Sequence, residues 1–262
     1  RTGVLRDMFQ NHMLQLLALV AMEPPTSFAA DDIRNEKVQV IGAVRPLDPV
    51  DSVRGQYRGY RQAPDVAPDS RTATYAALAC YIDNWRWQDV PFYLRSGKAL
   101  RSKSTEIVIR FKRPPRLMHE VAAGEAPAAN ILSLCIQPNE GIHLSFESKV
   151  PDTQAGVRSV DMDFRYRDSY GPDPLPRAYD RLLLDALRGD PSLFARSDAI
   201  EAAWRLIDPL VAAWQGKDAP PLVAYQPGSW GPAEAEALLG RSGRAWRLHC
   251  AQEDRTQART EA

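Results

Sequence analysis

Residues 6 to 25 read RDMFQNHMLQLLALVAMEPP, and this stretch sets the first element of the fold. Apolar side chains recur at helical spacing from Val4 to Val20, so we expect one α-helix over roughly residues 3 to 22. Pro24 and Pro25 end it, because a proline disfavours a helical conformation in the residue before it. The apolar run is too short to cross a bilayer and no signal-peptide cleavage site follows it. It therefore predicts a buried helix, with a further part of the protein expected upstream.

The rest of the chain alternates between helical and strand patterns. A second helix is expected from Asp31 and Asp32, which favour a helix start, up to the turn at Pro46. Residues 47 to 72 are rich in Pro, Asp, Gly and Arg and read as a loop, with Gly55-Gln56-Tyr57 in its middle. Strand patterns follow at 72–81, 92–94, 105–111, 130–137, 142–146 and 160–166, and helical patterns at about 178–188, 198–214 and 232–239.

Short turns join several of these strands, which favours antiparallel pairing over parallel βαβ units. The fold class we predict is α+β: a large, mainly antiparallel sheet with helices packed on one face. Residues 114 to 127 read as a Pro/Ala/Gly connection between strands, and residues 252 to 262 as a polar, flexible tail. A length of 262 residues is compatible with one large domain of this kind.

Composition excludes some classes of function. The formal net charge is zero, so neither nucleic acid nor a membrane is expected as a partner. The three cysteines, at positions 80, 135 and 250, form no CxxC pair, and we expect a reduced, cytoplasmic protein. No G-x-G-x-x-G occurs, and Arg95-Ser96-Gly97-Lys98 is too short for a P-loop. The four histidines are scattered without the spacing of metal ligands, so no metal site is predicted.

Longer stretches carry a resemblance. RDMFQNHMLQLLALVAMEPP resembles the catalytic helix of glucose-6-phosphate dehydrogenases. The resemblance continues, in family order, through IRNEKVQV at 33–40, TATYAALACYIDNWRWQDVPFYLRSGKAL at 72–100, QPNEGI at 137–142, AYDRLLLDALRGDPSLFARSDAIEAAW at 178–204 and GSWGPAEA at 228–235. It implies that residues 1–262 form the C-terminal domain of such an enzyme. Residues 1–25 would then lie at the boundary with an N-terminal, NADP-binding Rossmann domain that is absent here.

The resemblance also implies a reaction in the oxidative pentose phosphate pathway of glucose metabolism. His12 matches the general base that takes the proton from the C1 hydroxyl of D-glucose 6-phosphate. Histidine suits this role because its ordinary pKa of about 6.5 lies near cellular pH. C1 gives a hydride to NADP, and the product is 6-phospho-D-glucono-1,5-lactone. The residues that match substrate-binding positions are Asp7, Lys98, Lys103 and Gln137.

The same residues have plainer interpretations when the resemblance is set aside. His12 is then a packed or solvated helix histidine, and Asp7 an acid favoured near a helix start. Lys98 and Lys103 belong to a solvated basic loop, and Gln137 is a turn residue before Pro138. On an α-helix, five positions correspond to about 140° of rotation and about 7.5 Å of rise. Asp7 and His12 should therefore approach a sugar separately rather than form a hydrogen-bonded pair.

The resemblance leaves three further expectations. Arg95 matches a residue of the second, structural NADP site of animal enzymes, but Ser104, Val108 and Cys135 stand where basic residues are expected, so this site is not predicted. The large sheet forms the dimer contact in this family, which implies a homodimer. The isolated chain should be inactive, because the NADP loop lies in the missing domain. The alternative is a non-catalytic module that binds sugar phosphates or a partner.

Overall fold

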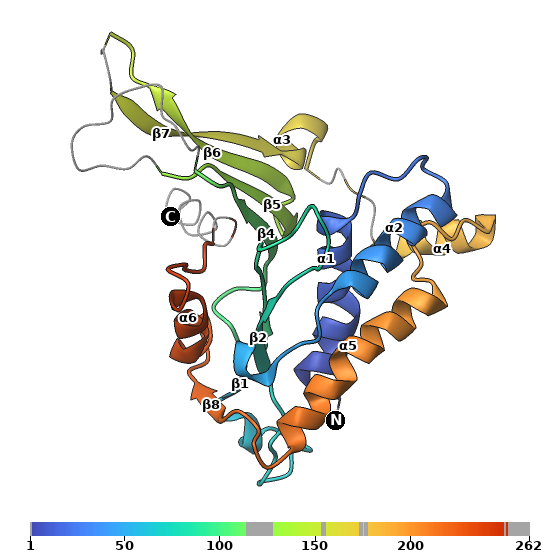
Figure 1. Cartoon of the computed structure of the whole chain (residues 1–262), viewed down its shortest axis with the longest axis vertical. Coiled ribbons are helices and arrows are strands. Elements are labelled where there is room, and N and C mark those ends of the chain that lie inside the picture. The colour runs from blue at the N-terminus through green and yellow to red at the C-terminus, as the bar shows by residue number, and fades with distance from the viewer. Residues whose placement is uncertain are drawn as a thin grey trace. The chain divides into compact units, whose positions relative to one another are not determined.

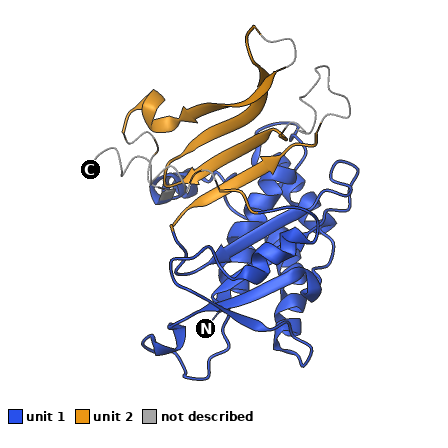
Figure 2. Cartoon of the chain, turned by 90° about the vertical axis from the view of Figure 1, so that its left-hand side faces the viewer, with its two compact units in different colours: residues 1–101, 177–245 blue, residues 102–176, 246–262 orange. Residues whose placement is uncertain are grey.

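The computed structural model describes residues 2–113, 128–152, 156–172, 175, 178–248 and 250. The expected connection at 114–127, the expected tail at 252–262, His119 and His249 lie outside the described residues. The chain divides into two compact units, as Figure 2 shows. Unit 1 comprises residues 1–101 and 177–245, and unit 2 comprises residues 102–176 and 246–262.

Unit 1 contains helices and one sheet, which confirms the α+β class (Figure 1). Its helical elements are η1 (Leu5–Met13), α1 (Leu14–Ala21), α2 (Ala30–Ala43), η2 (Pro49–Asp51), η3 (Tyr60–Gln62), α4 (Ala178–Arg188), α5 (Ser197–Gln215) and α6 (Ala233–Gly240). Its strands are β1 (Ser52–Tyr57), β2 (Tyr75–Cys80), β3 (Phe92–Gly97) and β8 (Leu222–Tyr225). In the part of the chain that the structure describes, none of the helices has both the length and the apolar character needed to cross a membrane.

The sheet of unit 1 has the order β3-β2-β1-β8. β1 and β3 pair antiparallel with β2, whereas β8 runs parallel to β1. The prediction of a loop throughout 47–72 is therefore wrong at β1, and β8 was not predicted. β1 is polar in sequence and yet buried, because partners outside the strand satisfy its side chains. Arg54 donates from Nε to the carbonyl oxygen of Pro220 at 2.6 Å, and Ser52 accepts a hydrogen bond from Trp214 Nε1 at 3.0 Å.

The core of unit 1 lies between the first helices, α5 and the sheet. Phe9 of η1 and Ile207 of α5 are fully buried in it. The other buried members are Val4, Leu5, Leu14, Leu17, Ala21, Val40, Val44, Ala76, Leu78, Cys80, Ile82, Ala203, Leu210 and Trp214. Figure 1 shows α1, α2 and α5 on one side of β1 and β2, and α6 on the other. Burial of this apolar surface fixes η1 against α5 and the end of β3.

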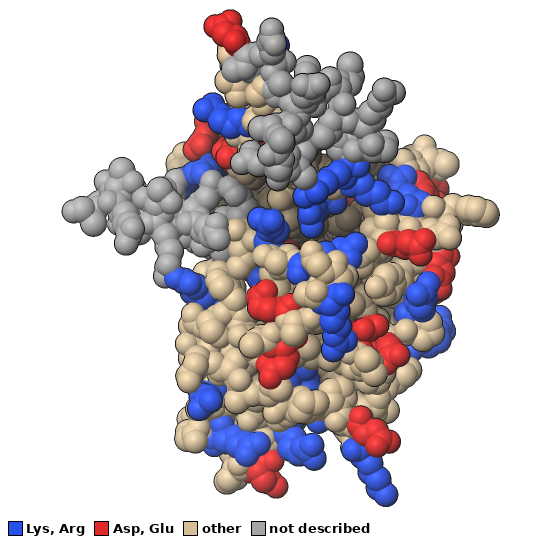
Figure 3. Space-filling model, turned by 60° about the vertical axis from the view of Figure 1, so that its left-hand side comes forward, with Lys and Arg blue, Asp and Glu red and all other residues tan. Residues whose placement is uncertain are grey.

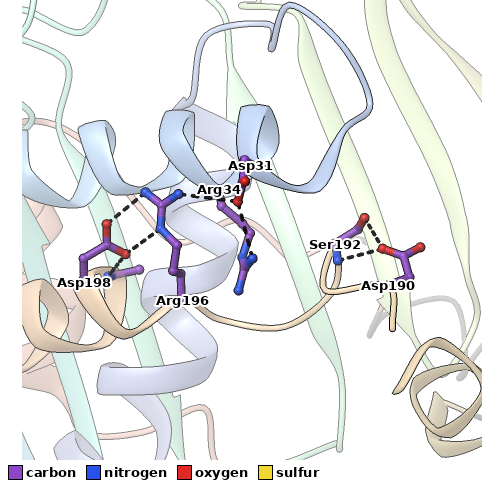
Figure 4. A network of polar contacts seen from close by, with 7 residues as sticks. Asp31, Arg34, Asp190, Ser192, Arg196 and Asp198 are labelled. Atoms are coloured by element: carbon purple, nitrogen blue, oxygen red, sulfur yellow. Dashed lines mark hydrogen bonds and ion pairs between the residues drawn. The ribbon is translucent and has the colours of Figure 1, made fainter. Parts of the chain in front are cut away.

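A surface network ties the start of α2 to the start of α5 (Figure 4). Arg196 donates to both carboxylate oxygens of Asp198 at 2.9 Å, and its third nitrogen lies 3.8 Å from Asp31. Asp31 also lies 3.6 Å from Arg34. The hydrogen bond from Arg196 holds the pKa of Asp198 below its ordinary value. Exposed pairs of this kind contribute at most about 1 kcal/mol each, so the network orients the two helices more than it stabilises them.

Unit 2 is an antiparallel sheet of four strands in sequence order. Its elements are β4 (Thr105–Arg110), β5 (Ile131–Gln137), β6 (Gly141–Lys149), β7 (Val157–Arg165) and the short helix α3 (Tyr166–Tyr170). All four strands match predicted ones. β6 and β7 begin before the predicted ranges of 142–146 and 160–166. The mainly antiparallel character is confirmed. In the part of the chain that the structure describes, the strands form two four-stranded sheets where one large sheet was expected.

The two faces of the unit 2 sheet differ in character. In an antiparallel sheet, directly paired residues point to the same face. One face, called here the apolar face, carries Ile107, Ile109, Leu132, Leu134, Ile142, Leu144, Phe146, Val160, Met162 and Phe164. Each of these ten side chains is partly or largely exposed. On the opposite face His143 is buried, 2.6 Å from Asp163 and 3.4 Å from Asp161.

The cysteines correct a prediction. Cys135 on β5 forms a disulfide bond with Cys250, so the expectation of a fully reduced chain is wrong. The backbone N–H of Cys250 also donates to Glu106 Oε2 at 3.0 Å. The spacing of 115 residues between the two cysteines gave no signal in the sequence. Cys80 is free and buried in unit 1, and burial raises the pKa of its thiol to about 12.

Candidate functional site

The first helical turns of the chain form a π-helix, η1, rather than the expected α-helix. In a π-helix the backbone hydrogen bond joins residues i and i+5, and such segments occur frequently at functional sites. Asp7 and His12 are five residues apart, which is the span of one π-helical backbone hydrogen bond. The rotation of about 140° calculated for an α-helix therefore does not apply. Both side chains are exposed, which leaves them accessible to a ligand.

Three contacts hold η1 in place. The N–H of Val4 donates to the carbonyl oxygen of Ala73 at 3.1 Å, just before β2. Phe9 is fully buried on the inner side of η1. Arg6 pairs with Asp208 of α5 at 3.7 Å. The helix thus turns Phe9 into the core and leaves Asp7 and His12 on its outer side.

Lys98 follows the last residue of β3. Its N–H donates to the carbonyl oxygen of Thr74 at 2.9 Å, and its own carbonyl accepts a hydrogen bond from the Tyr225 hydroxyl at 2.7 Å. Its Nζ lies 3.7 Å from Asp7 Oδ2, and the two side chains are 64% and 50% exposed. An exposed pair of this kind contributes at most about 1 kcal/mol, so an anionic ligand can compete for the ammonium. The structure therefore brings Asp7 and Lys98 together.

Close packing fixes the backbone in front of Lys98. A Cβ on Gly97 would lie 2.5 Å from Cδ2 of Tyr75, whose ring is fully buried. A Cβ on Gly231 would lie 2.5 Å from Cε2 of the same ring. Two glycine backbones thus lie close to the Tyr75 ring, at distances that leave no room for a Cβ. The segment Arg95-Ser96-Gly97-Lys98 has glycine at position 97 because no side chain fits there.

Four positions were matched to a second NADP site: Arg95 in unit 1, and Ser104, Val108 and Cys135 in unit 2. The Arg95 guanidinium lies over the Trp230 ring at 5.6 Å, on the side of the sheet where Tyr75 is buried. Cys135 is engaged in its disulfide, and Ser104 and Val108 carry no charge that could pair with a phosphate. Of these four side chains only that of Arg95 carries a charge that could pair with a nucleotide phosphate. Within the described residues, no group of His, Cys, Asp and Glu side chains could hold a metal ion.

Lys103 and Gln137 belong to unit 2. Gln137 lies at the end of β5 and donates from Nε2 to Thr105 Oγ1 at 3.1 Å, across the β4–β5 pair. Its amide oxygen stays available as an acceptor. The predicted contact of Lys103 and Gln137 with the sugar phosphate stays a prediction.

Charges of both signs are present on the surface of the molecule. On the face drawn in Figure 3, Asp and Glu side chains lie interspersed among Lys and Arg, in keeping with the zero net charge.

Two residues that form hydrogen bonds with the backbone of Lys98 were not predicted from the sequence. Thr74 was placed in a strand without a role, and Tyr225 fell in a segment with no predicted element. The hydrogen bond from Tyr225 to Lys98 spans 127 positions, so no local pattern could indicate it.

Comparison with known proteins shows the family to which the chain belongs. A family model described as "Glucose-6-phosphate dehydrogenase, C-terminal domain" matches residues 1–247. Glucose-6-phosphate 1-dehydrogenase from Chlamydia pneumoniae is 47% identical over 260 residues, covering 94% of this chain and 51% of that protein. The enzyme from Aggregatibacter actinomycetemcomitans is 46% identical over 262 residues, with the same coverage.

Solved structures of the same family have a similar fold. A glucose-6-phosphate dehydrogenase in complex with its substrate glucose-6-phosphate superposes with a TM-score of 0.84 at 36% identity, covering 94% of this chain and 52% of that one. The Mycobacterium avium enzyme gives a TM-score of 0.79 at 43% identity. The chain spans about half the length of the relatives it matches. By its sequence and its fold, the chain belongs to the glucose-6-phosphate dehydrogenase family and corresponds to that family's C-terminal domain.

Proposed function

We propose that the chain is the sugar-phosphate-binding, base-carrying part of an NADP-dependent glucose-6-phosphate 1-dehydrogenase. The whole enzyme oxidises D-glucose 6-phosphate at C1 to 6-phospho-D-glucono-1,5-lactone, the first reaction of the oxidative pentose phosphate pathway. The observation that carries the proposal is the pairing of Lys98 with Asp7 at 3.7 Å, on the same π-helix that carries His12. An ammonium, a carboxylate and an imidazole are the groups needed to hold a sugar phosphate and accept a proton from it.

Each residue has a distinct role in this proposal. Lys98 offers a point charge to the phosphate or to a sugar hydroxyl, and Asp7 accepts a hydrogen bond from a hydroxyl. His12 takes the proton from the C1 hydroxyl as C1 loses its hydride, and both electrons of the C1–H bond leave with that hydride. Lys103 and Gln137 contact the same substrate. When bound, NADP supplies the hydride acceptor.

The chain should not complete this reaction alone. The resemblance places the NADP loop outside this chain, and of the four positions matched to a second NADP site only Arg95 is basic. We propose that the NADP-binding part lies in the half of the relatives' length that this chain does not cover. A cytoplasmic location belongs to the same proposal. The Cys135–Cys250 bond argues against it, since disulfides are rare in the reducing cytoplasm.

A homodimer through the unit 2 sheet is also part of the proposal. Its support is the apolar face, on which Met162 is 60% and Ile142 is 42% exposed. Exposed apolar surfaces of this kind mark interaction sites, and a second copy of the chain would present the same surface. Met162→Asp should shift the sedimentation of the chain towards the monomer, whereas Met8→Asp would act through the core of unit 1. A parent chain that sediments as a monomer at micromolar concentration would contradict the dimer.

The experiment is NADP reduction by glucose 6-phosphate, measured for the chain alone and beside a His12→Asn variant. We expect no reduction by either protein alone. We expect reduction when the NADP-binding half of a relative is added to the parent, and none when it is added to His12→Asn. Activity of the parent chain alone would refute the claim that it lacks an NADP site. Equal activity of both proteins in the presence of the added half would refute the role of His12.

A further inference from the structure

The hydroxyl of Tyr225 reaches Lys98 from the opposite edge of the unit 1 sheet. Tyr225 ends β8, Lys98 follows β3, and β1 and β2 lie between these strands. The ring can cross β1 because Gly55 has no side chain there: a Cβ on Gly55 would lie 3.2 Å from Cδ1 of Tyr225. Tyr225 itself is only 3% exposed, so it cannot contact a ligand directly.

The donors and acceptors around this hydroxyl can be assigned. The carbonyl oxygen of Lys98 can only accept, so the Tyr225 hydroxyl donates to it at 2.7 Å. The Thr74 hydroxyl lies 3.0 Å from the Tyr225 oxygen and must then be the donor to it. Thr74 Oγ1 in turn accepts the backbone N–H of Tyr57 at 3.1 Å. Bonds arranged in such a chain polarise and strengthen one another.

Both peptide groups of Lys98 are thereby fixed by the same two residues. Its N–H donates to the carbonyl of Thr74, and its carbonyl accepts from Tyr225. The segment before Thr74 also anchors η1, since Ala73 accepts the N–H of Val4. The adjacent residues Ala73 and Thr74 therefore help to position both Lys98 and η1, the helix that carries Asp7.

We propose that Tyr225 is a positioning residue, which holds the ammonium of Lys98 beside Asp7 through its hydrogen bond to the Lys98 carbonyl. This inference rests on the proposed function, in which that ammonium binds the sugar phosphate. Burial raises the pKa of Tyr225 to about 12, so the hydroxyl keeps the proton that it donates at any pH of physiological interest.

The test removes the hydroxyl and keeps the ring. Glucose 6-phosphate is titrated by calorimetry into the parent chain, Tyr225→Phe, Lys98→Gln and the double variant, with Tyr60→Phe as the matched control in the same aromatic cluster. Tyr225→Phe should weaken binding roughly fivefold, the usual effect of one hydrogen bond. On the Lys98→Gln background the same change should have no further effect. If Tyr225→Phe lowered the affinity for glucose 6-phosphate by the same factor in both backgrounds, its role would be generally structural. That result would overturn the inference.

A second readout needs no ligand. Amide hydrogen exchange at Lys98 and Ala99 should be faster in Tyr225→Phe and in Thr74→Val, and near the parent's rate in Thr74→Ser, which retains a hydroxyl. If the parent binds no glucose 6-phosphate, the proposed function fails, and the exchange rates alone decide the role of Tyr225. Unchanged exchange at Lys98 in Tyr225→Phe would overturn it.

Discussion

Replacing Gly97 by alanine tests the packing that carries Lys98. The added Cβ would lie 2.5 Å from Cδ2 and 3.3 Å from Cγ of Tyr75. Carbon atoms in contact are normally about 3.5 to 4 Å apart, so ring and strand must separate by roughly 1 Å. The ring has little room to shift, because it is fully buried and the Gly231 backbone also lies close to it. Overpacking of this kind costs about 1 to 3 kcal/mol, and we expect the upper half of that range.

The assay is thermal and denaturant unfolding of unit 1, together with titration of glucose 6-phosphate. A loss of about 2 kcal/mol lowers Tm by roughly 4 to 8 °C in a domain of this size. Binding should weaken as well, since Lys98 is the next residue. Gly42→Ala is the control: it lies on the exposed side of α2 with no atom within 4 Å of the added Cβ, and should be neutral or stabilise by up to about 1 kcal/mol. A Gly97→Ala protein with the parent's Tm would refute the reasoning.

Two further predictions concern groups away from the ligand. Burial raises the pKa of Tyr75 and of Tyr225 from 10.0 to about 12, so both groups contribute stability below pH 10 that is lost as pH rises towards 12. Absorbance titration should show two of the nine tyrosines ionising last, and a protein in which all nine ionise near pH 10 would contradict this. Reduction of Cys135–Cys250 opens a loop closed across 115 residues and should destabilise unit 2 by up to about 4 to 5 kcal/mol. Thiol counting should find two new reactive thiols on reduction of the native chain, and an unchanged count would refute the bond.

The strands of unit 2 could be predicted because one face of its sheet is apolar. In β7, for example, Met162 and Phe164 alternate with Asp161 and Asp163, which gives the period of two that the sequence displays. β1 could not be found in this way, because its buried residues include Arg54, whose hydrogen bonds go to carbonyls more than 150 positions away. β8 has only four residues and was too short to show a period.

The site was accessible to sequence reasoning only in part. Asp7, His12 and Lys98 follow from the family resemblance, and nothing in their local pattern distinguishes them from solvated side chains. The π-helix was not predicted. The apolar positions in η1 fit helical spacing, but they do not show whether the backbone hydrogen bonds join residues i and i+4 or residues i and i+5. Tyr225 could not be found at all, since its link to Lys98 exists only once β8 has joined the sheet.

The central claim, that this chain carries the sugar-phosphate half of a dehydrogenase, is tested most directly by calorimetric titration of the chain with glucose 6-phosphate and with glucose. We expect the parent to bind glucose 6-phosphate and to bind glucose far more weakly. Lys98→Gln should lose most of that preference, and His12→Asn should bind nearly as the parent does. No binding by the folded parent, or binding that Lys98→Gln leaves unchanged, would contradict the account.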